Sequence, residues 1–438
     1  MRGAARKADA SALAVAVVGS GPAGCYAAQA IRKAIPESDV TVFDRLPIPF
    51  GLVRYGVAAD HQGTKAVTRQ FARLFEKDGV RFAGGVHVGE DVTLAQLRDA
   101  FDVVVVATGL HADAPLAVPG ADLPGVHGAG RITRLLNGHP GESRPAPRLG
   151  AVVGIVGNGN VAMDIVRLLA ADDDRLDGSD IDDDVHAALT GELRTLHVFG
   201  RSVPASAKFD PVMLGEIASL PGVAHVVHFA GEHDPADARS AAVRALPAEA
   251  AGAGSRLRVE WWFGASPLEV LGSSSVEGIS VSALDGKEFV VAVDDIITAV
   301  GFGADDAQQL VDVHDEARGT GRVDRGLYVT GWARRGPRGT IPTHRTDARE
   351  LAERIAREAF PSGRAAHLEL LGHLETTQYA DWSRLDLHEM ESAPSGRIRR
   401  KVSSLRDIRA ILSGAPIDLA PEPPDSASPT LTRTSEIS

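Results

Sequence analysis

Short runs of apolar, mostly β-branched residues recur along the chain, and several of them end at a glycine. The first run covers residues 14–18 and ends at Gly19. Residues 22–33 then have helical spacing, and residues 39–43 form a second apolar run. This order predicts a strand, a glycine-rich turn, a helix and a second strand, which is a nucleotide-binding arrangement.

A second unit of the same kind begins after residue 150. An apolar run at 151–156 precedes a glycine-rich turn at 157–160, a helical pattern at 161–171 and a further strand at 195–199. The two units predict an α/β protein with two Rossmann-like dinucleotide-binding domains. The other predicted elements are buried parallel strands at 102–107 and 295–300, a short strand at 327–330, helices at 64–77 and 347–360, and an irregular connection at 112–150.

Composition and charge narrow the function classes. The chain has 438 residues, 44% hydrophobic and 24% charged, which fits two large globular domains and excludes wholesale disorder. A net charge of −12 argues against general nucleic-acid binding. No apolar run approaches the roughly 20 residues that span a membrane, so a soluble, cytoplasmic protein is expected.

The cysteine count bears on redox chemistry. Cys25 is the single cysteine, which excludes a disulfide framework, a CxxC pair and a four-cysteine metal site. We therefore expect no metal site, and any redox chemistry has to sit on a bound organic cofactor.

Two segments fall outside the pattern of strands and helices. Residues 172–184 contain eight aspartates without a recognisable cation-ligand spacing, which predicts a solvated acidic loop. The end of the chain is rich in Pro, Ser and Thr and predicts a disordered tail over 413–438.

The first glycine-rich turn, residues 19–24, reads GSGPAG and matches the GxGxxG pattern. Gly19 permits the tight turn, Gly21 lets the backbone approach a pyrophosphate, and Gly24 lets the helix pack close to the strand. The helix N-terminus then faces the phosphates. Asp44 follows Gly19 by 25 positions, and its carboxylate can accept hydrogen bonds from a ribose 2′-OH but repels a 2′-phosphate. This site is predicted to hold FAD or NAD and not NADP.

The second turn is a GxGxxA, and its predicted cofactor contacts are Asn158, Gly159, Asn160, Val161 and Ala162. The strand that follows ends in Arg201, which suits a 2′-phosphate. The acidic segment explains the gap of 44 residues between Gly157 and Arg201. An acid-terminated unit followed by an arginine-terminated one predicts FAD first and a nicotinamide cofactor second, and hence hydride transfer between them.

Several ordered segments resemble one family, the adrenodoxin reductase type of ferredoxin–NADP reductases, over about residues 14–412. The two most specific matching segments are GLVRYGV at 51–57 and GWARRGPRGTIPT at 331–343. The others are VVGSGPAGCYAA at 17–28, VVVVATG at 103–109, VGNGNVAMDIVR at 156–167, SPLEVLG at 266–272 and TAVGF at 298–302.

The resemblance implies how the domains and sites are arranged. An FAD domain would comprise residues 1–112 and 322–412, with an NAD(P) domain inserted at 113–321. Ala23, Asp44, Leu52 and Val86 would line the FAD, and Trp332 with the backbone of Gly339, Thr340 and Ile341 would meet the flavin ring. Gly339 would also approach the nicotinamide, and His61 and Glu216 would lie beside both rings as modulators. A lone histidine is more often a structural hydrogen-bonding residue.

The chain departs from the family after the second strand of its second unit. The family has two adjacent arginines there, whereas this chain has Arg201 and Ser202, and a family glutamate falls on Met213. Losing one phosphate-binding arginine removes about 1.5–3 kcal/mol, or roughly ten- to hundredfold in affinity. Ser202 can donate one hydrogen bond to a phosphate or to a ribose hydroxyl. NADPH and NADH therefore both remain open.

The resemblance also implies a partner, a small acidic ferredoxin that docks on a basic surface and feeds oxygenases, including cytochromes P450. Candidate basic residues are Arg131 and Arg134, and Arg397, Arg399, Arg400 and Lys401. Solvated surface charges explain each cluster equally well. The favoured function is an FAD-dependent NAD(P)H–ferredoxin oxidoreductase. The alternatives are an NAD(P)H-driven reductase of quinones or small acceptors, and a flavin-binding protein with impaired turnover.

Overall fold

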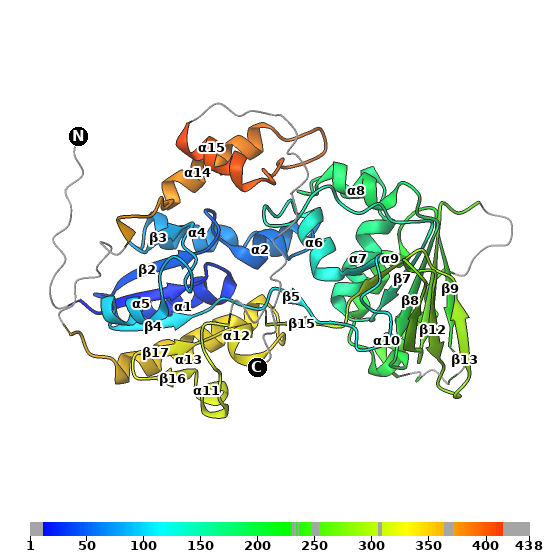
Figure 1. Ribbon diagram of the computed structural model, residues 1–438, viewed down its shortest axis with the longest axis horizontal. Helices are drawn as coiled ribbons and strands as arrows, with labels where there is room; N and C mark the ends of the chain where they lie inside the picture. Colours follow the sequence, from blue (N-terminus) through cyan, green and yellow to red (C-terminus); the bar gives the residue numbers. More distant parts are fainter. Residues whose placement is uncertain are drawn as a thin grey trace, which may run out of the picture.

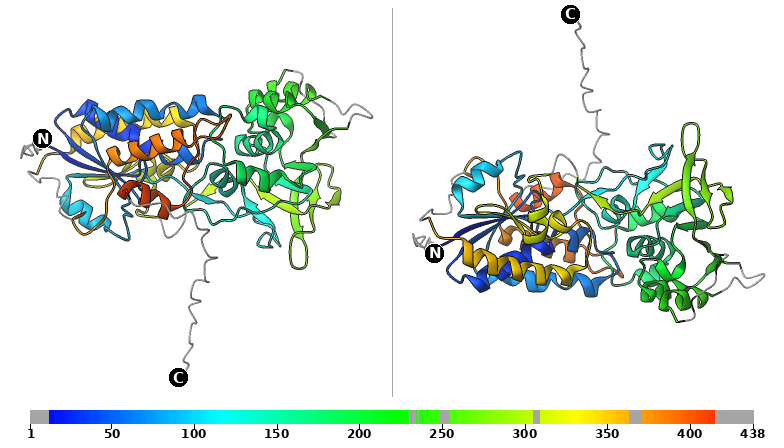
Figure 2. Two further views of the ribbon diagram at one scale, coloured as in Figure 1. Left: turned by 90° about the horizontal axis from the view of Figure 1, so that it is seen from above. Right: turned by 90° about the horizontal axis from the view of Figure 1, so that it is seen from below.

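The computed structural model describes residues 12–229, 231, 234, 236–247, 254–304, 309–362 and 371–414. Two six-stranded sheets form two lobes that lie side by side (Figure 1). Figure 2 shows the same two lobes from above and below. No helix among the described residues is long and apolar enough to cross a membrane.

The first sheet combines strands from both ends of the chain. Its central strand, β1 (Ala14–Val18), is completely buried and pairs in parallel with a strand on each side. The others are β2 (Asp39–Asp44), β3 (Arg81–Gly84), β4 (Val103–Val106), β17 (Leu327–Val329) and the antiparallel edge strand β16 (Arg322–Asp324), in the order β16-β17-β4-β1-β2-β3.

Helices cover both faces of this sheet, because strands with four consecutive valines cannot leave a face in water. One face packs against α1 (Pro22–Ala34), α13 (Ile341–Glu358), α4 (Thr68–Glu76), α14 (Tyr379–Glu391) and α15 (Leu405–Ser413). The other face packs against α5 (Leu94–Ala100) and α11 (Asp315–Thr320). The short helices α2 (Gly51–Tyr55), α3 (Gln62–Lys65) and α12 (Trp332–Arg335) lie between the lobes or at the sheet's carboxyl end.

The second sheet is parallel throughout, in the order β6-β14-β7-β8-β10-β9. Its strands are β6 (Val126–Gly128), β7 (Val152–Val156), β8 (Thr195–Gly200), β9 (Val223–His228), β10 (Leu257–Phe263) and β14 (Asp295–Thr298). An antiparallel sheet of β11 (Ser266–Leu271), β12 (Gly278–Ser282) and β13 (Glu288–Val291) shares a second core with it.

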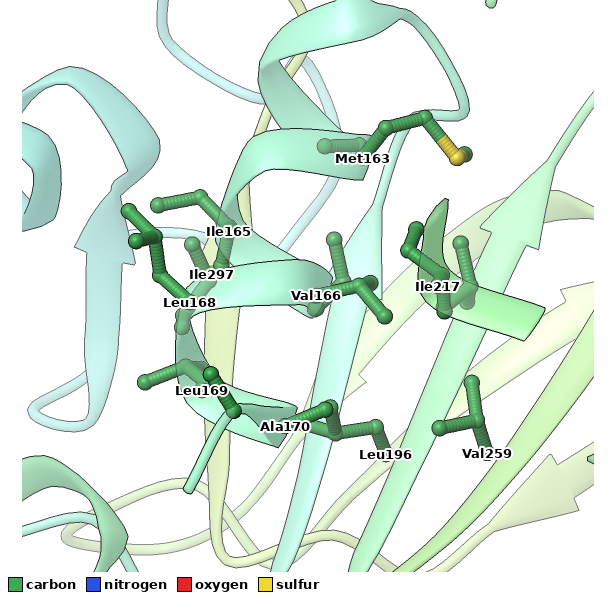
Figure 3. Close-up of a cluster of buried hydrophobic side chains, with 14 of the residues drawn as sticks. Met163, Ile165, Val166, Leu168, Leu169, Ala170, Leu196, Ile217, Val259 and Ile297 are labelled. Atoms are coloured by element: carbon green, nitrogen blue, oxygen red, sulfur yellow. The ribbon is translucent and has the colours of Figure 1, made fainter. Parts of the chain in front are cut away.

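The main core of this lobe lies between its helices and the parallel sheet. From α7 (Asn160–Ala170), Val166 and Ala170 point toward Leu196 of β8 and Val259 of β10 (Figure 3). The remaining elements of the lobe are α6 (Ala129–Leu136), η1 (Asp173–Leu176), α8 (Asp183–Thr190), η2 (Pro204–Ser206), α9 (Pro211–Ala218) and α10 (Ala238–Arg244).

The chain passes twice between the lobes. These two crossings pair with each other as the antiparallel strands β5 (Ala112–Asp113) and β15 (Phe302–Gly303).

The two sheets confirm the prediction of an α/β fold with two Rossmann-like units. The boundaries at 112/113 and 321/322 stay predictions.

Three predicted elements are wrong in detail. The helix predicted at 64–77 is divided: α3 ends at Lys65, whose side chain is buried, and α4 begins at Thr68. The helix predicted from residue 347 begins at Ile341, since proline in a first turn lacks only an N–H that has no helical partner. The connection predicted at 112–150 contains β6 and α6. Its helix starts where Asp113 accepts hydrogen bonds from two backbone N–H groups, a long-range cap that no local pattern reveals.

The end of the chain differs slightly from the predicted tail. Ser413 is the last residue of α15 and Gly414 caps it in the left-handed conformation. Residues 415–438 of the predicted tail lie outside the described residues.

Candidate functional site

A cavity lies at the carboxyl ends of β1, β2 and β4, where ligands of open α/β sheets bind. It extends from the first glycine-rich turn to α6 and α7 of the second lobe. Seven residues that the sequence assigns to FAD lie in its wall: Gly19, Gly21, Ala23, Asp44, Leu52, Val86 and Trp332.

The glycines of the first turn have different structural roles. Gly19 has φ +106°, and a Cβ there would lie 2.5 Å from the Ala107 carbonyl oxygen. A Cβ on Gly24 would lie 1.8 Å from the Gly19 oxygen, so α1 can approach β1 only with glycine here. A Cβ on Gly21 meets no atom within 4 Å. Gly24 is thus required by the fold, whereas Gly21 leaves room at the cavity wall for a ligand.

Asp44 is held in place by its neighbours. Its Oδ2 accepts hydrogen bonds from the Ser20 N–H at 2.8 Å and the Ser20 hydroxyl at 2.5 Å, and its Oδ1 accepts one from the Leu46 N–H at 2.9 Å. A carboxylate has about four acceptor positions, so capacity remains for a ribose hydroxyl.

Trp332 supplies a hydrogen-bond donor without a protein partner. Its Nε1 is buried and unpartnered among the described residues, and its ring stacks on Phe302 with centroids 5.6 Å apart. Such a buried donor is expected to meet a ligand acceptor. Gly339 and Thr340 are exposed and Ile341 is half-buried, just before and at the start of α13, and these three do not line the cavity.

The two predicted modulators lie close together. His61 Nε2 is 3.8 Å from Glu216 Oε2, and His61 Nδ1 is 3.7 Å from Asp164 Oδ1. Asp164 lies in the cavity wall. Glu216 comes from α9, so the pair joins residues of the two lobes.

Three further charged residues complete this cluster and were missed from the sequence. Arg167, with only 6% of its side chain exposed, donates to Asp60 at 2.7 and 2.9 Å and to Asp164 at 2.8 Å. It also lies 3.4 Å from Glu216. Asp164 and Arg167 are three positions apart on α7, immediately after the second glycine-rich turn, and that i,i+3 spacing was the available signal.

Burial and Arg167 act differently on the two carboxylates. Burial raises the pKa of Asp164, and Arg167 offsets this only in part. For Asp60 burial acts in the same direction, but the hydrogen bonds and charge of Arg167 outweigh it and lower the pKa. Of these two carboxylates, Asp164 is therefore the one more ready to take up a proton.

The second glycine-rich turn has the same steric pattern as the first. A Cβ on Gly157 would lie 2.4 Å from the Ala299 carbonyl oxygen, whereas one on Gly159 meets no atom within 4 Å. The Asn158 Nδ2 is buried without a partner among the described residues. Asn160 instead accepts a hydrogen bond from the Asp210 N–H at 2.8 Å, at the start of α9.

The other predicted nicotinamide contacts differ in exposure. Val161 lies in the cavity wall, whereas Ala162 is fully buried in the core. At the end of β8, Arg201 is exposed and Ser202 half-buried. The substitution site Met213 is half-buried on α9 and packs on the core of this lobe.

The basic residues considered for ferredoxin docking are mostly paired within the chain. Arg134 donates to Glu142 at 2.5 Å, and Arg131 lies 3.6 Å from the same carboxylate. Arg397 contacts Asp183 at 2.8 Å, and Arg399 is paired with Asp386. The cluster at 397–401 is therefore not a free surface patch. Arg400 is exposed.

The acidic segment is also not simply solvated. Asp173 is 91% exposed, as predicted, but Asp180 is 4% exposed and paired with Lys65 at 2.6 Å. The prediction of a solvated loop is wrong for Asp180, because cations from distant parts of the chain fold onto this segment. Within the described part of the chain, no group of His, Cys, Asp or Glu could hold a metal ion.

The fold and the cavity define a pyridine-nucleotide oxidoreductase. A family model described as pyridine nucleotide-disulphide oxidoreductase matches residues 13–175. Cindoxin reductase of Citrobacter braakii is 40% identical, covering 92% of this chain and 91% of the relative. NADPH-ferredoxin reductase FprA of Mycobacterium tuberculosis is 31% identical, covering 91% and 98%. The chain belongs to this family, the adrenodoxin reductase type of ferredoxin–NADP reductases.

A solved structure agrees with this assignment. Mycobacterium tuberculosis FprA in complex with NADPH superposes with a TM-score of 0.83 at 28% sequence identity, covering 92% of this chain and all of that one.

Proposed function

We propose that this chain is an FAD-dependent NAD(P)H–ferredoxin oxidoreductase. The observation that carries the proposal is a single cavity. It extends from the first glycine-rich turn to the first residues of α7, which follow the second glycine-rich turn. It has an open position at Gly21, an ordered carboxylate at Asp44 and an unpartnered donor at Trp332, so its residues fit FAD. The names of the related reductases support the same function.

The chain's own residues would bind and orient the two cofactors. Bound FAD would accept hydride from NAD(P)H and release the electrons singly. The Gly21 backbone and the N-terminus of α1 would face the pyrophosphate, and Asp44 would accept from a ribose hydroxyl. Gly159 and the α7 N-terminus would do the same for the nicotinamide cofactor.

The charged cluster would orient these groups. Hydride transfer needs alignment of two rings and no acid or base, so His61 and Glu216 act on geometry and potential. Arg167 hydrogen-bonds both Asp60 and Asp164, and Asp164 lies 3.7 Å from the His61 Nδ1.

We propose NADPH as the donor, with Arg201 as the main contact for its 2′-phosphate. The structure of FprA in complex with NADPH supports this choice. With Ser202 in place of the second arginine, the preference over NADH is expected to be smaller than in a two-arginine site.

The proposed electron acceptor is a small acidic ferredoxin in the cytoplasm, which in turn would feed an oxygenase such as a cytochrome P450. The family relatives named as ferredoxin reductases support the ferredoxin.

The test compares acceptors under identical conditions. The purified flavoprotein is supplied anaerobically with NADPH, and reduction of an acidic [2Fe–2S] ferredoxin is followed beside reduction of a small quinone. The proposal predicts a higher kcat/KM for the ferredoxin than for the quinone. Fast quinone turnover with no ferredoxin reduction would contradict it.

A further inference from the structure

Two buried lysines from distant parts of the chain share one carboxylate at the junction of the lobes. The Lys65 Nζ lies 2.6 Å from Asp180 Oδ1, and the Lys401 Nζ lies 2.9 Å from Asp180 Oδ2. The exposed fraction of the side chain is 7% for Lys65, 2% for Lys401 and 4% for Asp180. Both lysines also donate to the Asn137 side-chain oxygen, at 2.6 and 3.0 Å.

Asp180 holds the segment that carries His61 at two places. Its side chain binds Lys65, the last residue of α3, and its backbone N–H donates to the Ala59 oxygen at 3.2 Å. His61 is the N-cap of α3, so Asp60 and His61 lie between these two attachments.

We call the two attachments of Asp180 to the 59–65 segment the Asp180 clamp. Lys401 connects this clamp to the elements that border the cavity. Its Nζ donates to the Arg54 carbonyl oxygen at 3.2 Å, in α2, which also carries the cavity residues Leu52 and Tyr55. Its bond to Asn137 adds the C-terminal end of α6, whose Thr133 lines the cavity too.

The segment that carries Lys401 is itself fixed to both lobes. The Gly178 N–H donates to the Gly396 oxygen at 2.7 Å, and the Ile398 N–H donates to the Ser179 oxygen at 3.0 Å. On the side of the first lobe, Val402 donates its N–H to Glu389 of α14 at 3.0 Å.

The charges at this junction are tightly coupled. Burial lowers the pKa of Lys401, Asp180 opposes this, and the neighbouring Lys65 and Arg54 lower it further. Burial alone would raise the pKa of Asp180, but Lys401 and Lys65 lower it to about 2. Two neighbouring titratable groups are Glu389, which binds Arg54 at 2.6 Å, and Tyr55, whose ring lies 5.9 Å from the Lys401 Nζ. Arg399 lies 3.5 Å from Glu389, and the His139 ring packs on Tyr55.

We propose that Asp180 and Lys401 are positioning residues that hold the 59–65 segment, and with it His61, in the geometry required for hydride transfer between the cofactors. The role of these two residues in hydride transfer rests on the proposed function. Their role in holding the 59–65 segment does not depend on it.

The test replaces Lys401 with methionine. Lys401→Met keeps about the volume of the side chain and removes the link from Lys401 to Asp180, Arg54 and Asn137. It leaves one positive charge on Lys65 and one negative charge on Asp180, so no buried charge is stranded. The matched control is Lys287→Met, because Lys287 is 82% exposed and its ion pair is with the neighbouring Asp285.

Two quantities are measured for each variant. Hydrogen exchange is followed for the amides of residues 58–66, where the Lys65 and Ala66 N–H groups bond to His61 and Gln62. Anaerobic stopped-flow reduction by NADPH separates the limiting rate from the nucleotide Kd.

We expect Lys401→Met to speed exchange in 58–66 about tenfold or more, with global exchange unchanged. Its limiting rate should fall about ten- to hundredfold at an unchanged Kd, because small misalignments of reacting groups cost that much. The control should change neither quantity. Unchanged exchange, or faster exchange at an unchanged limiting rate, would overturn the proposal.

Two provisions keep the test decisive. If Lys401→Met does not fold, Lys401→Gln is used. It keeps an N–H donor at this position and leaves the same buried charges as Lys401→Met. If the parent protein is not reduced by a nicotinamide at all, the proposed function fails, and the exchange measurement still decides whether Lys401 clamps the 59–65 segment.

Discussion

At the residue scale, Ser202 bears most directly on nucleotide choice. It stands beside the exposed Arg201 at the end of β8, where a second cation would be available to a 2′-phosphate. We predict that Ser202→Arg lowers the Kd for NADPH about tenfold or more and leaves the Kd for NADH nearly unchanged, because only NADPH carries the extra phosphate.

Nucleotide titrations of the purified flavoprotein check this. Ser206→Arg, an exposed position on η2, is the matched control for an added charge nearby. An equal gain for both nucleotides would show that position 202 does not face the 2′-phosphate.

His225 makes a separate prediction about acid stability. Its Nδ1 accepts from the Trp261 Nε1 at 3.2 Å, and burial lowers its pKa to about 4. The unfolded chain, with a histidine pKa near 6.5, binds the proton more readily in the window from about 6.5 to 4, so stability falls as pH falls through it. The loss at pH 5 is about 2 kcal/mol.

His225→Asn keeps an acceptor for Trp261 and removes this titration. Between pH 7 and 5, the free energy of unfolding should fall about 2 kcal/mol less in the variant than in the parent. Urea denaturation at the two pH values measures this, with the exposed His373→Asn as control. Parallel pH profiles for parent and His225→Asn would sink the prediction.

At the element scale, the first glycine-rich turn separates folding from binding. We predict that Gly24→Ala destabilises the protein even without cofactor, because its Cβ would overlap the Gly19 carbonyl oxygen. Gly21→Ala should leave the melting temperature of the apoprotein unchanged and weaken FAD binding, because its Cβ enters open space at the cavity wall.

Thermal unfolding of the apoproteins and FAD titration distinguish the two effects. Loss of apoprotein stability in Gly21→Ala, with FAD affinity intact, would contradict this division of roles.

Local sequence predicted the elements that depend on local physics. The strand, turn and helix at Ala14–Ala34 follow from buried valines and from glycines that sterics require. The start of α6 did not follow, because its capping group is Asp113, which lies far from it in the chain. The same limit applies to residues 172–184, which the sequence predicts to be a solvated loop. Their ion pairs with Lys65, Lys401 and Arg397 come from distant parts of the chain and have no local sequence signal.

At the scale of the whole molecule, the family resemblance named residues from distant parts of the chain that the fold brings together. His61 and Glu216 come from different lobes and still meet within 3.8 Å. Arg167, Asp60 and Asp164 were missed. The i,i+3 spacing of Asp164 and Arg167 indicates that they share one face of α7, but not that this face meets Asp60 and Glu216 from other elements.

The central claim is that one cavity holds FAD and receives a nicotinamide from the second lobe. The most direct test is anaerobic stopped-flow bleaching of the bound flavin near 450 nm, a wavelength general to oxidised flavins, with NADPH and NADH titrated separately. We predict rapid bleaching by NADPH at low concentration and slower or weaker bleaching by NADH. Bleaching by neither nucleotide would contradict the reductase assignment and leave a flavin-binding protein without turnover.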